Sequence, residues 1–549
     1  MQKSSPAKDW IRTKIVCTSA CPPPRCRPAL HRAWALRVRP RHPAAWVSAS
    51  VRARACACTS VLTRSALLAV GPITQDCDSL KALYNAGMRC ARMNFSHGSH
   101  EYHAQTIANV RQALGTKDVC AIMLDTKGPE IRTGKLQEKE VKIEQGSTLT
   151  LKYFPDDPQG MVNKGCSEWI TQDYANLSKV LEVGKQVCID DGLLSLTVTA
   201  INGTDVVCKV NNTVMLGETK GVNLPGTPVD LPALSEKDKS DLVFGVQQGV
   251  DLIAASFVRK GQDVVDIRKV LGMPGRDIMI FSKIESQEGV DNFDEILELS
   301  DGIMVARGDL GIEIPIQQVY TVQKMIIDKC NAAGKPVITA TQMLESMIVN
   351  PRPTRAEVTD VANAVTQGTD CVMLSGETAK GKWPVECVKM MAEICRTAEA
   401  ALDYQAEYQR LTKASFGAKT NKVQEAVSAA AVKTALDTNA SMLMALTQSG
   451  ATARAIARLK PQQRIVALTP SDATARKLCL SRGVFPRVIG SMIGSDQVLA
   501  HNCTKLIDEG MLAEGDVVVS SHGDNHSSPG STSVLKVIVA KSRAGEANN

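Results

Sequence analysis

Two short motifs, each at the end of an apolar stretch, carry the side chains best suited to chemistry. The first is Ser282-Lys-Ile-Glu285 and the second is Val305-Ala-Arg-Gly-Asp-Leu-Gly311. Glu285 and Asp309 offer the oxygen donors that a hard divalent cation such as Mg²⁺ or Mn²⁺ prefers, and Lys283 offers a point charge for a phosphate. Enzymes that transfer phosphoryl groups typically place a divalent metal ion and a positively charged side chain in one cleft. Either motif alone is more simply a surface ion pair or a helix cap, so the interpretation depends on further sites.

Polar motifs follow other apolar stretches in the same way. They are Arg92, Asn94 and Ser96; Asp125-Thr-Lys-Gly-Pro-Glu-Ile-Arg132; Thr341; and Ser375-Gly-Glu377. A barrel of parallel strands builds its active site at the carboxyl ends of several strands at once. The repeated placement therefore predicts one composite site, which a single motif would not.

The elements that must position these residues are short apolar runs alternating with amphipathic helical stretches. The runs are Met88–Phe95, Val119–Asp125, Asp251–Phe257, Asp277–Lys283, Gly302–Ala306, Pro336–Thr341 and Cys371–Ser375. An eighth strand could come from Ile15–Thr18 or from Ala66–Val70. Eight parallel strands with crossover helices predict an α/β fold, a (β/α)₈ TIM barrel formed by residues 71–129 and 229–400.

Two intervals depart from this rhythm. Residues 130–228 alternate with a period of two between turn signals such as Asp190-Asp-Gly192 and Asn202-Gly203. This pattern predicts a small β-barrel lid domain inserted after the third strand. Residues 401–549 return to alternating strands and helices, which predicts a C-terminal α/β domain.

Composition narrows the class of protein. The net charge of +7 comes from residues 1–70, where 13 Lys and Arg face one acidic residue, so the remaining chain carries −5 (7 − 12). This basic segment lacks the interleaved aromatic residues of a nucleic-acid-binding arm, and no window holds the ~20 apolar residues of a membrane span. The 17 irregularly spaced cysteines predict reduced thiols. We expect a cytoplasmic protein without a nucleic-acid or membrane partner.

Together the motifs resemble those of the pyruvate kinase family over about residues 71–549. The matching segments are Arg92–Gly98, Leu124–Thr133, Ser282–Glu285, Asp301–Glu313, Ala340–Ser346, Pro351–Glu357 and Leu374–Thr378. The resemblance implies transfer of the phosphoryl group of phosphoenolpyruvate to ADP, giving ATP and an enolate that is protonated to pyruvate. It also implies Mg²⁺ (or Mn²⁺) and K⁺ as cofactors, a regulatory role for the C-terminal domain, and a homotetramer.

For the transferred phosphate, the resemblance implies a set of cations. Lys283 would contact the phosphoryl oxygens in the transition state of the transfer, where positive charge contributes most. Arg92 and Arg132 would clamp the same group. Glu285 and Asp309 would hold the Mg²⁺, which takes up developing negative charge.

For the rest of the substrate, the resemblance implies backbone contacts and a hydroxyl. The N–H groups of the turn Ala306-Arg307-Gly308 would cradle the carboxylate, beside Asp309. Thr341 would order the water that protonates the enolate. The predicted catalytic residues are thus Lys283, Arg92 and Thr341.

The resemblance also implies a monovalent-cation site and a nucleotide site. The K⁺ ligands are Asn94, Ser96, Asp125 and Thr126, and the nucleotide contacts are Pro72, Asn94, Ser96, His97, Arg132 and Lys220. Glu130 is the acidic variant typical of K⁺-dependent members, because its carboxylate adds charge that a cation must offset. Helical spacing also makes a metal site of His97, His100 and His103 conceivable, although an ordinary exposed helix is the simpler interpretation.

A loop near the C-terminus, Thr447-Gln-Ser-Gly-Ala-Thr452, resembles the family's sugar-phosphate effector loop. Its candidate effector contacts are Thr447, Ser449, Gly450 and Thr452. Two positions that are usually basic in members regulated by fructose 1,6-bisphosphate are Gln448 and Ala451, and the later loop 520–530 has no basic residue. We therefore expect a singly phosphorylated sugar or no effector; Gly450 could also be simply a tight turn.

The segment before the barrel departs from the family. Members open with a strand like Lys14-Ile-Val-Cys-Thr18 that runs directly into an apolar-Gly-Pro turn, which stands here as Val70-Gly71-Pro72. Residues 19–68 therefore read as an insertion that splits the first strand. The segment is Arg-rich and has no acidic residue from Trp10 to Gln75, as in a transit peptide, so an organellar location is the alternative. A presequence, however, would precede the strand.

Without the family resemblance, the residues are also compatible with two other functions. One is another Mg²⁺-dependent enzyme of pyruvate or phosphoenolpyruvate on an aldolase-like barrel, which would not need the lid, Lys220 or the run Asp125–Arg132. The other is a non-catalytic, effector-sensing or nucleic-acid-binding relative disabled by the split strand.

Overall fold

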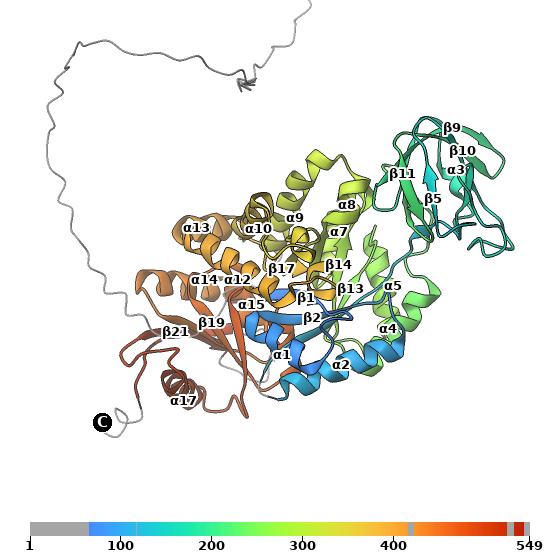
Figure 1. Cartoon of the computed structure of the whole chain (residues 1–549). Coiled ribbons are helices and arrows are strands. Elements are labelled where there is room, and N and C mark those ends of the chain that lie inside the picture. The colour runs from blue at the N-terminus through green and yellow to red at the C-terminus, as the bar shows by residue number, and fades with distance from the viewer. Residues whose placement is uncertain (1–64, 117, 416–421, 524–531, 543–549) are drawn as a thin grey trace, which may run out of the picture. The chain divides into compact units, whose positions relative to one another are not determined.

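A computed structural model describes residues 65–116, 118–415, 422–523 and 532–542, which all belong to one unit of the chain (Figure 1). The basic segment as far as residue 64, with the candidate strand Ile15–Thr18, lies outside the described residues. So does most of the loop 520–530.

Eight parallel strands form a closed barrel in the order β1-β17-β16-β15-β14-β13-β3-β2. They are β1 (Ser65–Ala69), β2 (Met88–Asn94), β3 (Ala121–Asp125), β13 (Leu252–Ala255), β14 (Met279–Ile284), β15 (Gly302–Ala306), β16 (Val337–Ala340) and β17 (Cys371–Leu374). Most of their side chains are buried, because the strands are covered on both faces. The predicted (β/α)₈ barrel is confirmed, but its first strand begins at Ser65, before the predicted start at residue 71 and within the segment interpreted as an insertion.

Of the two candidates for the eighth strand, the structure uses the second. Leu67 pairs with Met373 of β17 on one side and with Cys90 of β2 on the other. The Thr378 hydroxyl donates to the Ala69 carbonyl at 2.8 Å, which ties the end of β1 to the turn after β17. The barrel therefore closes without an open edge.

The helices around the barrel begin and end at recognisable caps. Asp76, Ser99, Ser235 and Thr354 accept hydrogen bonds from backbone N–H groups at helix starts. The long helices are α1 (Cys77–Ala86), α2 (His100–Leu114), α4 (Glu236–Gln248), α5 (Gly261–Leu271), α9 (Val319–Ala333), α10 (Arg355–Gln367) and α12 (Pro384–Ala400). The short ones are α6 (Gln287–Asp291), α7 (Phe293–Leu299), α8 (Arg307–Glu313), α11 (Gly376–Ala379), η1 (Ile316–Gln318) and η2 (Glu345–Ile348).

The segment between β3 and β13 forms its own sheets around a separate apolar core. The larger sheet contains β4 (Ile131–Arg132), β12 (Gly221–Asn223), β8 (Gln186–Ile189), β9 (Leu194–Asn202), β10 (Asp205–Val210), β6 (Thr148–Lys152) and β7 (Trp169–Thr171). A smaller sheet pairs β5 (Glu140–Ile143) with β11 (Val214–Gly217), and α3 (Leu177–Val180) is the one helix within residues 130–228. A bridge between Thr133 and Gln172 links the two edges of the larger sheet, so it curls back on itself as a small barrel would.

The C-terminal part is an open α/β sheet, in strand order β20-β19-β18-β21-β22. Its strands are β18 (Met442–Leu446), β19 (Arg464–Thr469), β20 (Val484–Val488), β21 (Val517–Gly523) and β22 (Thr532–Val539). Its helices are α13 (Tyr404–Ser415), α14 (Lys422–Asp437), α15 (Ala451–Arg458), α16 (Asp472–Leu478) and α17 (Ser495–Asp508). The predicted C-terminal α/β domain is confirmed.

This sheet's helices and loops contact the amino ends of the barrel strands through ion pairs. Lys460 Nζ lies 2.6 Å from Asp370 Oδ1, directly before β17, and Arg476 Nε lies 2.8 Å from Asp251 Oδ1, directly before β13. The polar motifs predicted to be functional lie at the other end of the strands.

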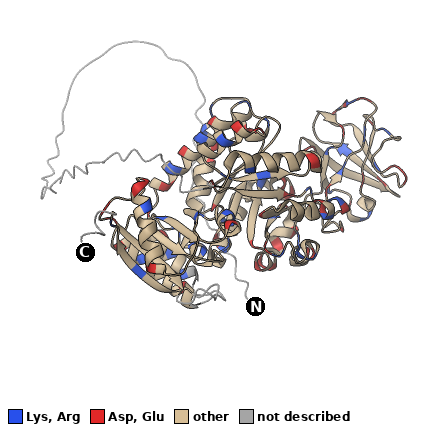
Figure 2. Ribbon diagram, turned by 90° about the horizontal axis from the view of Figure 1, so that it is seen from below, with Lys and Arg blue, Asp and Glu red and all other residues tan. Residues whose placement is uncertain are grey.

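Elsewhere, acidic and basic side chains are intermixed along the helices and loops (Figure 2). The twelve cysteines within the described ranges are all free thiols. No helix in these ranges is long and apolar enough to span a membrane.

Candidate active site

Four charged side chains converge at the carboxyl ends of β2, β3 and β14. Asp125 accepts from Arg92 Nε at 2.6 Å through one oxygen and lies 3.3 Å from Lys283 Nζ through the other. Lys283 Nζ is 2.9 Å from Glu285 Oε1. Residues 92, 125 and 283 are far apart along the chain, so the barrel alone brings them together.

The charges within this group keep Asp125 and Lys283 ionised. Burial would raise the pKa of Asp125, but the charges of Arg92 and Lys283 more than offset it and lower the pKa below its ordinary value. Burial would likewise lower the pKa of Lys283, and the carboxylates of Asp125 and Glu285 outweigh it and raise the pKa. A charged ammonium thus lies at the base of the site at neutral pH.

For Glu285 and Asp309, burial outweighs the nearby positive charge, so the pKa of each is raised. Burial raises the pKa of Glu285 although Lys283 acts against it. Burial, followed by repulsion from Glu285, raises the pKa of Asp309 to about 7. The buried carboxylate of Glu285 and the half-buried one of Asp309 share one nearby ammonium, so the pair fits a divalent cation that would supply the missing positive charge.

Glu285 and Asp309 supply two carboxylates, and a backbone N–H orients one of them. No group of three or more His, Cys, Asp or Glu side chains forms a metal-binding cluster in the part of the chain that the structure describes. Mg²⁺ is typically held by one or two carboxylates while water and substrate phosphates complete its shell. The Phe257 N–H donates to Glu285 Oε2 at 2.6 Å and so orients the carboxylate.

The arginine of the turn after β15 points toward the loop after β16 and toward α10. The Arg307 guanidinium donates to the Thr341 carbonyl at 2.7 Å and to Asp360 Oδ1 at 2.7 Å. A Cβ on Gly308 would lie 3.0 Å from Thr341 Cγ2, so the two strand-end loops pack closely. Thr341 itself has a φ of +72°, a strained value for a β-branched residue. Arg307 therefore positions the loop of Thr341.

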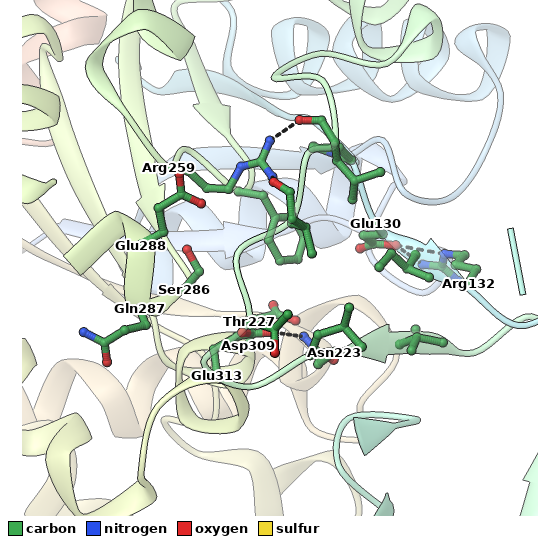
Figure 3. A pocket seen from close by; sticks show the side chains of 18 of the residues that line it. Glu130, Arg132, Asn223, Thr227, Arg259, Ser286, Gln287, Glu288, Asp309 and Glu313 are labelled. Carbon is green, nitrogen blue, oxygen red and sulfur yellow. Dashed lines mark hydrogen bonds and ion pairs between the residues drawn. The ribbon is translucent and has the colours of Figure 1, made fainter. Parts of the chain in front are cut away.

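A cavity of about 750 Å³ is lined by residues of the barrel and of the inserted segment, among them Asp309 but not Arg92, Asp125, Lys283 or Glu285 (Figure 3). Its wall includes four predicted residues from separate parts of the chain: His97, Arg132, Lys220 and Asp309. Lys220 Nζ lies 3.0 Å from Asp190 Oδ1 across the lid.

The two predicted phosphate-clamping arginines have different partners. Arg92 is held by Asp125, as above, whereas Arg132 Nη2 lies 2.5 Å from Glu130 Oε2 and Nη1 donates to the Thr219 carbonyl at 2.9 Å. Arg132 is thus held by partners within the lid segment, whereas Arg92 is held by a barrel residue.

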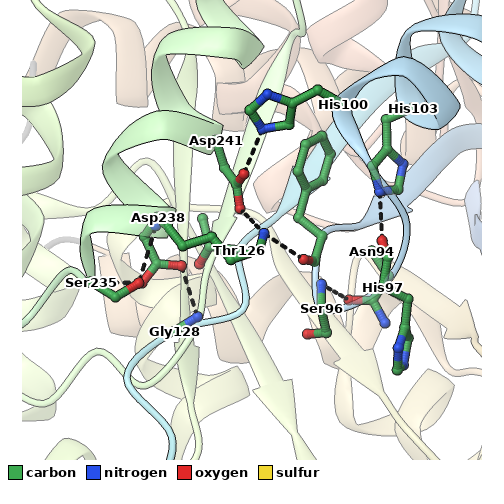
Figure 4. A network of polar contacts seen from close by, with 12 residues as sticks. Asn94, Ser96, His97, His100, His103, Thr126, Gly128, Ser235, Asp238 and Asp241 are labelled. Carbon is green, nitrogen blue, oxygen red and sulfur yellow. Dashed lines mark hydrogen bonds and ion pairs between the residues drawn. The ribbon is translucent and has the colours of Figure 1, made fainter.

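The predicted K⁺ ligands lie on two neighbouring strand ends. Asn94 and Asp125 are paired in register between β2 and β3, and the Ser96 N–H donates to Asn94 Oδ1 at 3.2 Å (Figure 4). The Thr126 hydroxyl accepts from the Ser256 N–H at 3.1 Å. All four side chains offer only oxygen donors or an amide, which fits a hard monovalent ion.

The three histidines do not share a site. His100 Nε2 donates to Asp241 Oδ1 at 2.7 Å, while His103 Nε2 donates to the His97 carbonyl at 2.8 Å. Each ring therefore has its own hydrogen-bond partner or cavity position. The expectation of an exposed helix is wrong for His103, which is buried and stacks on Phe95 at 4.0 Å between ring centroids.

Comparison with known proteins agrees with this geometry. A model of the family described as "Pyruvate kinase, barrel domain" matches residues 63–388, and one described as "Pyruvate kinase, alpha/beta domain" matches residues 425–538. The chain belongs to the pyruvate kinase family. It is 48% identical to "Pyruvate kinase" of Dictyostelium discoideum (87% of this chain, 95% of the relative) and 48% identical to "Pyruvate kinase PKLR" of Homo sapiens (86% and 84%). It is 45% identical to "Pyruvate kinase" of Clostridium acetobutylicum (86% and 99%).

The extent of the pyruvate kinase match agrees with the strand assignment. The barrel match begins at residue 63, directly before β1. Pro72 follows this strand in a turn where a Cβ on Gly71 would lie 2.5 Å from the Ala379 carbonyl oxygen, so only glycine fits this approach.

The candidate effector loop is held by a hydrogen bond within it and by one to β22. The Thr447 hydroxyl accepts from the Gly450 N–H at 3.0 Å, and the hydroxyls of Thr452 and Thr532 lie 2.7 Å apart. Gly450 has a φ of +83°, as a tight turn requires. Arg454 donates to the Ser449 carbonyl at 3.2 Å and is a basic residue near this loop that the motif comparison overlooked.

Sequence reasoning also missed Ser256. Its hydroxyl lies 2.8 Å from Lys283 Nζ and donates to the Thr126 carbonyl at 2.6 Å. Ser256 directly follows β13, so the rule that polar residues after barrel strands are functional would have found it.

Proposed function

We propose that this protein transfers the phosphoryl group of phosphoenolpyruvate to ADP, giving pyruvate and ATP, with Mg²⁺ (or Mn²⁺) and K⁺ as cofactors. The observation that carries the proposal is the convergence of Lys283 with Asp125 and Glu285, one ammonium between two carboxylates at the mouth of the barrel. Membership of the pyruvate kinase family supports the same reaction.

The transferred group meets the cationic side of the site. The Lys283 ammonium contacts the phosphoryl oxygens as the bond to the enol oxygen breaks, and its raised pKa keeps it charged at that moment. Arg92, oriented by Asp125, binds the same group from β2. Glu285 and Asp309 hold Mg²⁺, which supplies charge neutralisation to the substrate when bound.

The remaining substrate atoms meet backbone and hydroxyl groups. The N–H groups of Ala306, Arg307 and Gly308 bind the carboxylate, and the close packing of Gly308 on Thr341 keeps that turn in place. The Thr341 hydroxyl orients the water whose proton reaches the enolate carbon.

The nucleotide and the monovalent ion occupy neighbouring positions. Asn94, Ser96, Asp125 and Thr126 hold K⁺. Pro72, His97, Arg132 and Lys220 contact ADP, with Asn94 and Ser96 beside it. Because the cavity wall includes both barrel and lid residues, closure of the lid excludes water from the transferring phosphate.

A coupled assay with lactate dehydrogenase tests the reaction. We expect NADH oxidation that requires phosphoenolpyruvate, ADP and Mg²⁺ together and that rises on addition of K⁺ over tetramethylammonium at equal ionic strength. Turnover of phosphoenolpyruvate without ADP would support the aldolase-like alternative instead. No turnover by the folded protein would support the non-catalytic one.

We further propose a homo-oligomer, a tetramer by family resemblance. Large apolar side chains exposed after β15 and β16, namely Ile316, Tyr320 and Val349, offer surface for contact between copies. Light scattering of the purified protein tests this, and a monomeric mass would contradict it.

An effector with a single phosphate is the regulatory candidate, because Arg454, which donates to the Ser449 carbonyl, supplies a cation beside the Thr447–Thr452 turn. Titrating glucose 6-phosphate against fructose 1,6-bisphosphate tests the preference. The free thiols support a reducing compartment such as the cytoplasm, which cell fractionation tests.

A further inference from the structure

A side chain in the first turn of α4 forms a hydrogen bond with the loop after β2. Lys237 Nζ donates to the Phe95 carbonyl at 2.9 Å and lies 2.5 Å from Asp241 Oδ2, one helical turn further along (Figure 4). Asp241 is 1% exposed, and its other oxygen accepts from His100 Nε2 at 2.7 Å. The ammonium is thus held in place by a buried carboxylate that is itself held by a second helix.

Another side chain in this part of α4 forms a hydrogen bond with the loop after β3. Asp238 Oδ1 accepts from the Gly128 N–H at 3.0 Å, while Oδ2 is occupied by the N–H and hydroxyl of Ser235 in a capping box. Asp238 is fully buried. A Cβ on Gly128 would lie 2.7 Å from Ser256 Cβ, so this loop has no room to shift toward β13.

These two loops carry the four predicted K⁺ ligands. Phe95 lies between Asn94 and Ser96, and Gly128 comes two residues after Thr126. One helix therefore holds a backbone group next to the predicted ligands in each of the two loops.

The loop after β2 is also restrained from its other side. The Phe95 ring stacks on His103 at 4.0 Å between centroids, and His103 Nε2 donates to the His97 carbonyl at 2.8 Å. Lys237 thus supplies the remaining restraint on the Phe95 carbonyl, toward α4.

We propose that Lys237, Asp238 and Asp241 are positioning residues for the monovalent-cation site. They fix the separation between the Asn94/Ser96 loop and the Asp125/Thr126 loop, and so set the affinity for K⁺ and its preference over smaller ions. This rests on the proposed K⁺ dependence of the reaction. Groups that orient metal ligands commonly change metal affinity by about 10- to 100-fold when they are removed.

The charges of the pair fit this role. The carboxylate of Asp241 balances the ammonium of Lys237, so the lysine holds the loop without adding net positive charge beside a cation site. Removing Asp241 alone would leave that ammonium unbalanced near the loop and repel the ion, in addition to freeing the lysine.

The test compares Lys237→Met with Lys239→Met in the full chain. Lys239 lies two residues further along α4, is half-exposed, and pairs with Glu236 at 2.6 Å without touching either loop. Without substrates, we measure the rise in Tm on adding KCl against tetramethylammonium chloride, and hydrogen exchange of the peptide spanning residues 92–98. With substrates, we measure half-saturating K⁺ and the ratio of activity in K⁺ to that in Na⁺.

For Lys237→Met we expect half-saturating K⁺ to rise by about 10-fold or more, with kcat at saturating K⁺ reduced less than about threefold. We also expect faster exchange at residues 95–97 and a smaller difference between K⁺ and Na⁺. Lys237→Arg, which retains a charged donor, restores part of the affinity, and Asp241→Asn provides a second variant if Lys237→Met folds poorly.

Two results would overturn the inference, and they are distinct. If the wild type responds to K⁺ but Lys237→Met binds it as Lys239→Met does, the positioning role is wrong and the K⁺ site stands. If neither the Tm nor the activity of the wild type responds to K⁺, the proposed K⁺ site itself is wrong and the inference fails with it.

Discussion

Asn223 in the lid segment and Glu313 at the end of α8 are joined by a hydrogen bond of 3.0 Å between Nδ2 and Oε1. Both residues line the cavity (Figure 3). The helix that ends at Glu313 begins at the substrate turn and carries Asp309, so one short helix connects the proposed metal site to the lid. Burial raises the pKa of Glu313, while the bond from Asn223 acts in the opposite direction.

Replacing Asn223 by alanine is expected to loosen the lid. The half-buried Glu313 carboxyl would lose one of its donors, which favours its neutral form. We expect KM for ADP to rise about fivefold with a smaller change in kcat, as for loss of one hydrogen bond worth about 1 kcal/mol. Asn212→Ala, which removes a 2.7 Å bond to the Leu193 carbonyl elsewhere in the same segment, is the control. Equal ADP kinetics in the two variants would argue against a link through α8.

Replacing Lys283 by methionine should abolish most of the activity. The charge on the transferring group would be lost, and Asp125 and Glu285 would be left facing each other with less compensation. We expect kcat to fall about 10³-fold, as for other transition-state donors. Steady-state rates from the coupled assay give the number.

Ser256→Ala is the matched comparison for that lysine. It removes the 2.8 Å contact to Lys283 Nζ but leaves the charge in place, so a loss of only about tenfold is expected. A Lys283→Met enzyme as active as Ser256→Ala would mean that this charge is not at the reacting phosphate.

Metal affinity should depend on pH through Asp309. Burial and the nearby Glu285 raise the pKa of Asp309 to about 7, so this carboxyl is increasingly protonated below neutrality. Divalent ions bind the carboxylate, and protons therefore compete with the metal on the acid side. We expect Mn²⁺ affinity, measured by electron paramagnetic resonance, to weaken by up to about tenfold per pH unit below pH 7 and to level off above pH 8. Affinity independent of pH from 5.5 to 8.5 would contradict this assignment.

The same shift predicts how Mg²⁺ affects stability. A carboxyl with a raised folded-state pKa costs stability as pH rises from its unfolded pKa toward its folded pKa, because the folded protein then holds a proton that the unfolded chain releases. Bound Mg²⁺ offsets the ionised carboxylate. The rise in Tm on adding Mg²⁺ should therefore be larger at pH 8 than at pH 6.

Much of the fold could be predicted because its strands have a simple sequence signal. Buried parallel strands such as Gly302–Ala306 are continuous apolar runs, and the lid strands alternate with a period of two. The first strand was ambiguous, because Ile15–Thr18 and Ala66–Val70 are both short apolar runs, and pairing with β2 and β17 distinguishes them only in three dimensions.

The site was predictable at strand ends and less so elsewhere. Lys283, Glu285 and Asp125 follow the rule that barrel strands end in functional residues. Arg132 forms an ion pair with Glu130, which lies two residues away in the lid segment, and the sequence pattern did not indicate this local pairing. The inward turn of the Arg307 guanidinium depends on Asp360, which lies on α10, and no local pattern indicates that contact.

The ion pair between Lys460 and Asp370 should be a strong link between the C-terminal sheet and the barrel. The Asp370 carboxylate accepts from Lys460 Nζ at 2.6 Å, from the Arg482 N–H at 3.3 Å and from the Val337 N–H at 3.1 Å. The two side chains are only 3% and 7% exposed. Lys460→Met leaves a buried carboxylate without its main cation, and breaking a buried pair in this way costs about 3–5 kcal/mol.

Native-state hydrogen exchange in peptides from β17 and α15 measures this cost locally, without assuming that a multidomain protein unfolds in one step. Lys433→Met is the control. Lys433 also forms an ion pair, with Asp437 one turn along α14, but both side chains are exposed, so its replacement should change hydrogen exchange very little. The double variant Lys460→Met/Asp370→Asn should recover much of the loss, since it removes both charges together. If Lys460→Met alone exchanges like Lys433→Met, the pair does not hold the two parts together, and the contact must depend on Arg476 with Asp251 instead.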